Sequence, residues 1–307
     1  MRRRWALAFP AALALVLGSC FGGHSTSAPD VPAPDQAPIR IGTKNFPEQF
    51  ILGELYIQAL KAKGFNVVDK GKVGSTEIAH RALTAGSLDM YPEYIGVLLS
   101  EIAGKTDRPA SAAAAYKLAK RYEEHGDYTL LRATPFSNAN ALAVKPAYAR
   151  RHRLSSIADL KRINGPVRLV ALPEFRNRYE GLTGLRKVYG LRKLRLIVVQ
   201  DSAQRYPTLD SGKADVTLAF TTDGRLAGGQ YVVLSDPRGV FAAGHAAPVI
   251  SRKVLKAHGP GLARAIDAVT AKLTTAAMRR MNKAVEIDGR TPAAVAKEFL
   301  RSQSLVG

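Results

Sequence analysis

The sequence predicts an α/β protein with two sheet-containing lobes, and three observations lead to that prediction. Hydrophobic residues make up 46% and charged residues 23% of the 307 residues, as is typical of a globular protein. From Ile39 onward, short apolar runs alternate with amphipathic helical stretches, a pattern typical of parallel α/β sheets. Roughly 270 residues carry this alternation, and that length favours two parallel sheets over one.

The individual elements follow from hydrophobic periodicity and from turn residues. Strands are expected where short apolar runs lie between turn-forming residues, at 39–42, 66–68, 88–91, 142–144, 167–172, 194–199 and 216–220. Helices are expected where apolar residues recur every three or four positions, at 47–63, 74–86, 111–125, 261–273, 278–285 and 291–302. The first helix has Asn45 as its expected N-cap, with Pro47 and Glu48 in its first turn and Gly64 as its stop.

The N-terminus has the features of a secretory signal. Three arginines at 2–4 precede a continuous apolar run at 5–17, which is shorter than the roughly 20 residues that a membrane-spanning helix needs. The run ends in Leu-Gly-Ser-Cys, an order that resembles a bacterial lipobox, and Cys20 is the only cysteine. We therefore expect a signal peptide at 1–19 and a lipidated Cys20, the alternative being a plain signal peptide that contains a cysteine.

A segment rich in glycine, serine, alanine and proline follows Cys20. Residues 20–38 cannot bury a core, so they are expected to form a flexible tether. A lipid and a tether would hold a globular body at the outer face of the cytoplasmic membrane. The net charge of +20 suggests an anionic partner. Because no basic stripe with interleaved aromatic residues is present, we expect no nucleic-acid partner and interpret the charge as a solvated surface with a weak preference for membranes.

Motifs for cofactor, metal and nucleophilic chemistry are missing from the sequence. It contains no P-loop, no Gly-x-Gly-x-x-Gly after the first strand, no Gly-x-Ser-x-Gly, and no metal-ligand spacing among its six histidines. We therefore expect no cofactor, no metal and no enzyme activity. One alternative stays open, a secreted hydrolase, because five carboxylates could meet in three dimensions: Glu77, Asp89, Glu93, Glu174 and Asp223.

Eight segments share their order and spacing with one known family. They lie at 42–49, 74–77, 88–96, 141–144, 173–178, 187–190, 220–223 and 246–249. These segments resemble the solute-binding proteins of ABC transporters that import glycine betaine, carnitine, choline and related osmoprotectants. The resemblance implies a type II periplasmic-binding-protein fold, in which two α/β lobes joined by a two-segment hinge surround a ligand cleft. It places lobe I at 39–138 plus 245–307 and lobe II at 139–244, and it implies a monomer.

The resemblance also implies where a solute would bind. In the family a lysine at a strand end and an arginine of the second lobe hold a carboxylate, and four tyrosines surround a quaternary ammonium. Lys44 and Arg178 match the two basic positions. A carboxylate favours such charged donors, and a quaternary ammonium favours aromatic faces.

Only two of the four aromatic positions keep a ring. Tyr94 matches one tyrosine, and Phe220 keeps the ring of a second without its hydroxyl. Asn140 stands at the third position, and Gly244 followed by His245 stands near the fourth. The set of expected ligand-binding residues is therefore Lys44, Tyr94, Asn140, Arg178, Phe220 and His245. A cage with two rings is more open, so another polar solute is an alternative ligand.

These expectations combine into one functional interpretation. The chain is expected to bind a small solute outside the cytoplasm and to deliver it to a membrane permease with its ATPase. No covalent chemistry would take place on it. Three alternatives remain at this point: a ligand-sensing lipoprotein without transport, the secreted hydrolase named above, and a protein that binds wall polymers or nucleic acid through its positive charge.

Overall fold

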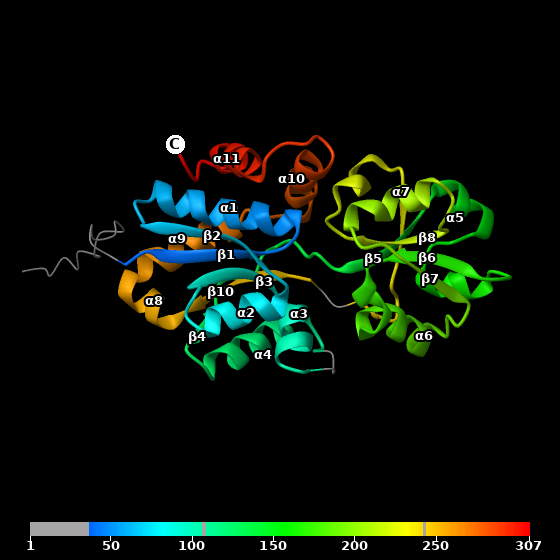
Figure 1. Ribbon diagram of the computed structural model, residues 1–307, viewed down its shortest axis with the longest axis horizontal. Helices are drawn as coiled ribbons and strands as arrows, with labels where there is room; N and C mark the ends of the chain where they lie inside the picture. The colour runs from blue at the N-terminus through cyan, green and yellow to red at the C-terminus, as the bar shows by residue number, and fades with distance from the viewer. Residues whose placement is uncertain (1–36, 106–108, 242–243) are drawn as a thin grey trace, which may run out of the picture.

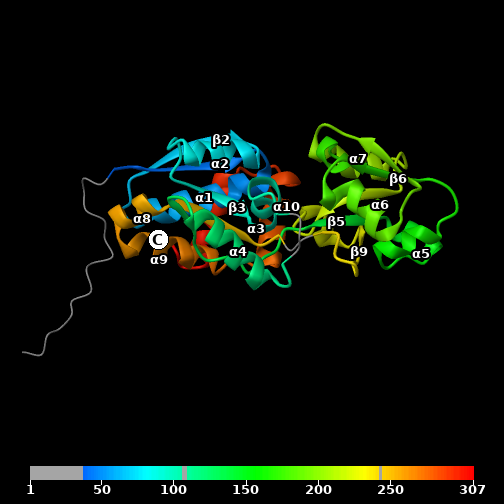
Figure 2. The same cartoon turned by 90° about the horizontal axis from the view of Figure 1, so that it is seen from below.

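The computed structural model describes residues 37–105, 109–241 and 244–307. The predicted signal peptide, Cys20 and most of the predicted tether lie outside the described residues. The described chain forms two α/β lobes that lie side by side along the longest axis (Figure 1 and Figure 2). This confirms the prediction of two α/β lobes. None of the helices in the described ranges has the length and apolar character needed to span a bilayer.

Lobe I contains a five-stranded sheet in the order β2-β1-β3-β10-β4. Its strands are β1 (Ile39–Lys44), β2 (Val67–Gly74), β3 (Met90–Tyr94), β4 (Tyr128–Leu130) and β10 (Ala246–Ser251). β1 pairs in parallel with β2 and β3, whereas β10 is antiparallel to both β3 and β4. The strand that lies between β3 and β4 therefore comes from late in the sequence.

Helices cover both faces of the lobe I sheet. They are α1 (Pro47–Ala62), α2 (Thr76–Thr84), α3 (Ile95–Val97) with a π turn at Leu98–Ile102, α4 (Ala112–Glu124), α8 (Arg252–His258), α9 (Pro260–Thr270), α10 (Thr275–Glu286) and α11 (Pro292–Ser302). Helices α1 and α11 lie on one side of the sheet and α2 and α4 on the other (Figure 1). Apolar side chains of α1, α9, α10 and α11 form one buried cluster, and those of α2, α4 and the π turn form another. Asn45 is not the N-cap of α1. Phe46 takes that place without a side-chain bond, since Pro47 sets the first helical turn.

Lobe II contains a second five-stranded sheet in the order β7-β6-β8-β5-β9. Its strands are β5 (Asn140–Val144), β6 (Val167–Ala171), β7 (Leu194–Val198), β8 (Val216–Phe220) and β9 (Val232–Leu234). Its helical segments are α5 (Pro146–His152), α6 (Gly184–Tyr189), α7 (Arg205–Asp210) and short turns at Ile157–Arg162, Pro173–Arg176, Tyr179–Thr183, Ser202–Gln204 and Gly224–Gly228. Three separate apolar clusters fill this lobe.

The expectation of parallel sheets was wrong, because each sheet is mixed. In lobe II, β5 is antiparallel to β8 and β9, and in lobe I, β10 is antiparallel to its two neighbours. β5 and β10 are the strands by which the chain enters a lobe after leaving the other one. They therefore enter each sheet from the junction between the lobes and run opposite to strands that follow a covering helix.

Two chain segments cross between the lobes side by side. The Asn138 amide donates to the Gly244 carbonyl at 2.8 Å, and Ser137 pairs with His245 in an antiparallel bridge. A Cβ atom at Gly244 would lie 1.5 Å from the Asn138 carbonyl oxygen, so this approach requires glycine. Thr221, just after β8, joins the pair through its hydroxyl, which donates to the Ser137 carbonyl at 2.7 Å.

Candidate functional site

Five of the six predicted ligand-binding residues lie at or next to strand ends that face the junction between the lobes. Lys44 ends β1, Tyr94 ends β3 and Phe220 ends β8, while Asn140 begins β5 and His245 directly precedes β10. The carboxyl ends of parallel strands meet at one edge of a sheet, the usual position of ligand crevices in α/β folds. The mixed topology adds the start of β5 and of β10 to the same edge.

Lys44 is buried and already paired. Its ammonium forms an ion pair with Glu93, donates to the Thr76 hydroxyl at 3.2 Å and lies 4.5 Å from the centre of the Tyr94 ring. Burial lowers the pKa of Lys44, and the charge of Glu93 partly offsets that effect. The charge of Lys44 is therefore compensated within lobe I, which the sequence did not reveal.

Tyr94 uses its hydroxyl inside lobe I. That hydroxyl donates to Glu48 Oε1 at 2.6 Å, and Phe46 stacks on the ring with centroids 6.1 Å apart. Burial raises the pKa of Tyr94 well above its usual value, and the charge of Glu48 adds to the shift. The hydroxyl is consequently a donor throughout the physiological pH range.

Arg178 contributes a cation from lobe II. It directly precedes the turn Tyr179–Thr183 and is exposed. The hydroxyl of Ser75, 2.5 Å from Glu77, is the largest cause that lowers the pKa of Glu77, and the charges of Arg178 and Lys44 lower it further. Arg178 also lowers the pKa of Lys44. The arginine of lobe II and the strand-end lysine of lobe I therefore act electrostatically on the same region.

Asn140 and Phe220 form a cross-strand pair in lobe II. The side-chain amide of Asn140 donates from Nδ2 to the backbone carbonyl of Glu180 at 2.9 Å. The guanidinium of Arg205 lies 4.7 Å from the centre of the Phe220 ring and pairs with Asp223 at 3.4 Å. The face of the Phe220 ring therefore already interacts with the guanidinium of Arg205.

His245 is held by the backbone of lobe I. Its Nδ1 lies 2.9 Å from the carbonyl oxygens of both Thr134 and Phe136, so that nitrogen carries the proton. The ring fixes the second crossing segment to the first.

Four of the five carboxylates of the hydrolase alternative have a side-chain partner within the protein. Asp89 pairs with Arg40, Glu93 with Lys44 and Asp223 with Arg205. Glu77 accepts from Ser75, and Glu174 is exposed at the start of a turn in lobe II. In the described ranges, no group of three or more histidine, cysteine, aspartate or glutamate side chains is arranged to hold a metal ion.

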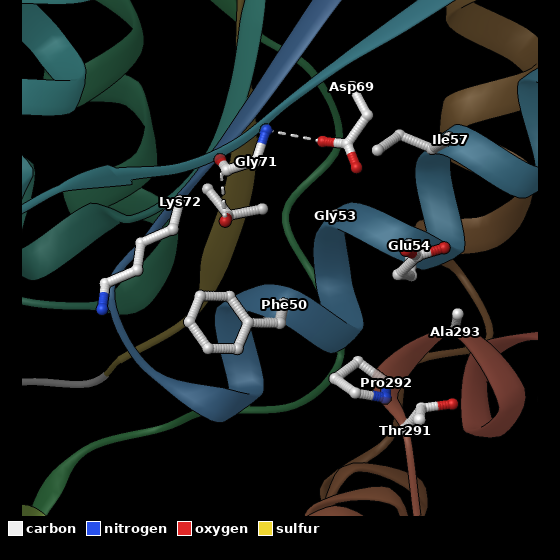
Figure 3. Close-up of a pocket in the computed structure, with 11 residues that line it drawn as sticks. Phe50, Gly53, Glu54, Ile57, Asp69, Gly71, Lys72, Thr291, Pro292 and Ala293 are labelled. Atoms are coloured by element: carbon white, nitrogen blue, oxygen red, sulfur yellow. Dashed lines mark hydrogen bonds between the residues drawn. The ribbon is translucent and has the colours of Figure 1, made fainter.

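Two cavities open elsewhere on lobe I. One, of about 240 Å³, lies between α1, β2 and the start of α11, with Phe50 and Pro292 on its wall (Figure 3). Another, of about 470 Å³, lies between α4, β4 and Asp267. Neither is lined by a residue expected to bind the ligand, so the candidate site is the junction and not these hollows.

Comparison with known proteins assigns the chain to a family. Residues 37–302 match the family described as the substrate-binding domain of an ABC-type glycine betaine transport system. The chain belongs to this family. The resemblance inferred from the sequence motifs is thereby confirmed.

Individual members of the substrate-binding family are similar over nearly their whole length. A glycine-betaine-binding protein of Pseudomonas aeruginosa is 34% identical over 278 residues, which cover 87% of this chain and 88% of that protein. The structure of YehZ from Escherichia coli has a TM-score of 0.71 at 28% identity and covers 88% of this chain and 100% of that one. The structure of a glycine betaine/carnitine/choline ABC transporter protein has a TM-score of 0.76 at 26% identity, covering 87% and 99%.

Several residues that shape this family member's site escaped the sequence analysis. The sequence indicates Glu48 only as an acid in the first helical turn, and Glu93 only as one carboxylate of the hydrolase alternative. Arg205 was not singled out. Their roles depend on partners distant in the sequence, such as Lys44 and Glu93, which are 49 positions apart.

Proposed function

We propose that this chain binds a betaine-like solute between its lobes and presents it to an ABC permease and its ATPase as a monomer. Lobe I would comprise 39–138 plus 245–307, and lobe II 139–244. A lipid on Cys20 would hold the protein at the outer face of the cytoplasmic membrane. No step of this cycle makes or breaks a covalent bond on the chain.

One observation carries the proposal: Lys44 and Tyr94 end strands of lobe I, and Asn140 and Phe220 are paired at strand ends of lobe II, on both sides of the junction. The charge of Arg178 lowers the pKa of both Lys44 and Glu77, although it belongs to the other lobe. A solute carboxylate placed there would receive charge-assisted hydrogen bonds from Arg178. The Thr76 hydroxyl at the start of α2 would support it from lobe I.

The cationic end of the solute would face aromatic rings. Tyr94 and Phe220 come from different lobes, and each already has one cation of the chain near it. An ammonium would therefore use the remaining ring surface, beside Asn140 and His245. A solute that contacts both lobes favours the closed arrangement over the open one, which is how binding would be signalled to the permease.

Titration calorimetry with glycine betaine tests the proposal. We expect Arg178→Ala to weaken binding by about tenfold or more, because a charged hydrogen bond is lost. Arg192→Ala is the matched control, since Arg192 is also an exposed arginine of lobe II. It precedes the amino end of β7, whereas Arg178 follows the carboxyl end of the neighbouring parallel strand β6. Equal losses in both variants would refute the role of Arg178, and wild-type protein that fails to bind would refute the ligand.

The membrane attachment has its own test. Full-length protein expressed in a bacterial host should sediment with membranes and incorporate labelled fatty acid. Cys20→Ala should abolish the labelling, whereas Ser19→Ala, next to it, should keep it. A labelled Cys20→Ala variant would contradict lipidation at this residue.

A further inference from the structure

A buried carboxylate lies at the meeting point of the two lobes. Glu48 is the second residue of α1 and is only 3% exposed. Three side-chain donors surround it: the Tyr94 hydroxyl and Asn138 Nδ2 reach Oε1 at 2.6 and 2.8 Å, and Asn282 Nδ2 reaches Oε2 at 2.7 Å. The N-terminus of α1 adds a favourable dipole.

The three donors belong to three different parts of the molecule. Tyr94 lies in the candidate site. Asn138 lies in the first crossing segment, where its backbone amide donates to the Gly244 carbonyl. Asn282 lies on α10 and makes a second bond from the same nitrogen, to the Thr222 carbonyl at 2.8 Å. Thr222 follows β8 of lobe II. One carboxylate thus connects the site, the crossing segment and the opposite lobe.

The same region contains buried polar atoms that lack hydrogen-bond partners. Among the described residues they include Asn138 Oδ1, Asn282 Oδ1, Thr222 Oγ1 and Gln49 Nε2. A buried polar atom without a partner costs free energy, so it requires an explanation. A rotation of lobe II would move Thr222 relative to Asn282 and exchange these partners.

We infer that Glu48 is a positioning residue that couples the orientation of Tyr94 to the angle between the lobes. Closure of the lobes would displace Asn138 and Asn282, and Glu48 would transmit that displacement to the Tyr94 hydroxyl. A solute that fixes the Tyr94 ring would, by the same connection, favour one lobe angle. The part of this inference that concerns the solute rests on the proposed function.

A double-mutant cycle on Tyr94→Phe and Asn282→Ala tests the coupling. No hydrogen bond joins these two side chains in the described structure, but both donate to Glu48. Because Asn138 Nδ2 also lies 3.4 Å from the Tyr94 hydroxyl, the cycle is repeated in the Glu48→Gln background to show whether the coupling passes through Glu48. Calorimetry with glycine betaine should show each variant weakened by about tenfold and the double variant by clearly less than the product. In the Glu48→Gln background the effects should multiply. Effects that multiply in both backgrounds would overturn the inference.

A second readout requires no ligand. X-ray scattering of the unliganded protein should give a changed radius of gyration for Glu48→Gln, Asn282→Ala and Tyr94→Phe. Glu123→Gln is the matched control, because Glu123 is a lobe I carboxylate 2% exposed that bonds to His80 at 3.0 Å, away from the crossing segments. It should keep the wild-type radius and affinity. Equal changes in Glu48→Gln and Glu123→Gln would refute the coupling.

The two readouts separate the two proposals. If wild-type protein does not bind glycine betaine, the proposed ligand is wrong. The radius of gyration of the unliganded variants then still decides whether the coupling exists. If binding is normal but Tyr94→Phe leaves the radius unchanged, the coupling is wrong and the ligand stands. Circular dichroism verifies folding, and Asn138→Ala replaces Glu48→Gln if the latter does not fold.

Discussion

The ammonium of Lys44 lies 4.5 Å from the centre of the Tyr94 ring. The guanidinium of Arg205 lies at a similar distance, 4.7 Å, from the Phe220 ring. Both rings expected to hold the cationic end of a solute therefore already interact with cations of the protein. A solute bound as proposed would gain less from its own cation here than in a complete aromatic cage, and its acidic end would become more important.

The first prediction concerns the choice between glycine betaine and choline. Choline has the quaternary ammonium but no carboxylate, so it cannot use Arg178. We expect it to bind at least about tenfold more weakly than glycine betaine, as measured by calorimetry. Arg178→Ala should reduce this difference, while Arg192→Ala should preserve it. Equal affinities for the two compounds in wild-type protein would contradict the prediction.

The second prediction concerns the buried pair of Lys44 and Glu93. Glu93→Gln leaves a buried ammonium without its counter-charge, and it should cost about 3 kcal/mol in the free energy of unfolding. The double variant Lys44→Met/Glu93→Gln should recover more than half of that loss, because neither position of the pair then carries a buried charge. Urea denaturation measures both. A double variant less stable than Glu93→Gln would show that the pair is not the cause.

The third prediction concerns the close approach of the crossing segments. Gly244→Ala places a Cβ against the Asn138 backbone, which must move, so we expect a loss of about 2 kcal/mol and a changed radius of gyration. Gly228→Ala is the control, since its Cβ would meet only Gln230 Cγ at 3.8 Å. Denaturation and X-ray scattering make the comparison. If Gly244→Ala changed neither the free energy of unfolding nor the radius of gyration, the two crossing segments would separate at little cost.

The fourth prediction concerns pH. The backbone amide of Ser155, followed by that of Ser156, lowers the pKa of Asp159 to about 2, in a capping box at the turn Ile157–Arg162. A lowered acid pKa stabilises the fold above the usual value near 3.8, and this stabilisation is lost as pH falls through about 2. Asp159→Asn should cost about 1 kcal/mol at pH 7 and almost nothing near pH 2. A cost independent of pH would exclude the charge as its source.

Most of lobe architecture could be predicted from local patterns. The strands at 167–171 and 216–220 are apolar runs bounded by turns, and the structure contains both. The strands at 128–130 and 232–234 were missed because three residues carry too little periodicity. The strand at 246–251 contains Pro248, which a sequence argument takes as a strand breaker.

The site was less accessible to sequence analysis. Strand ends are visible in a sequence, so the positions of Lys44 and Phe220 at one edge could be anticipated. Their neighbours could not, because the ion pair with Glu93 and the stacking with Arg205 depend on tertiary packing. Burial determines what these charges can do, and burial of a charged side chain is not encoded in local pattern.

The position of β10 between β3 and β4 has a consequence for folding. A nascent chain leaves the ribosome from its N-terminus, and all strands of lobe II precede β10 in it. Until residues 246–251 emerge, β3 and β4 keep unpaired edges, which are prone to misassociation. Lobe II can thus be finished first, and lobe I reaches completion only after the polypeptide returns to it.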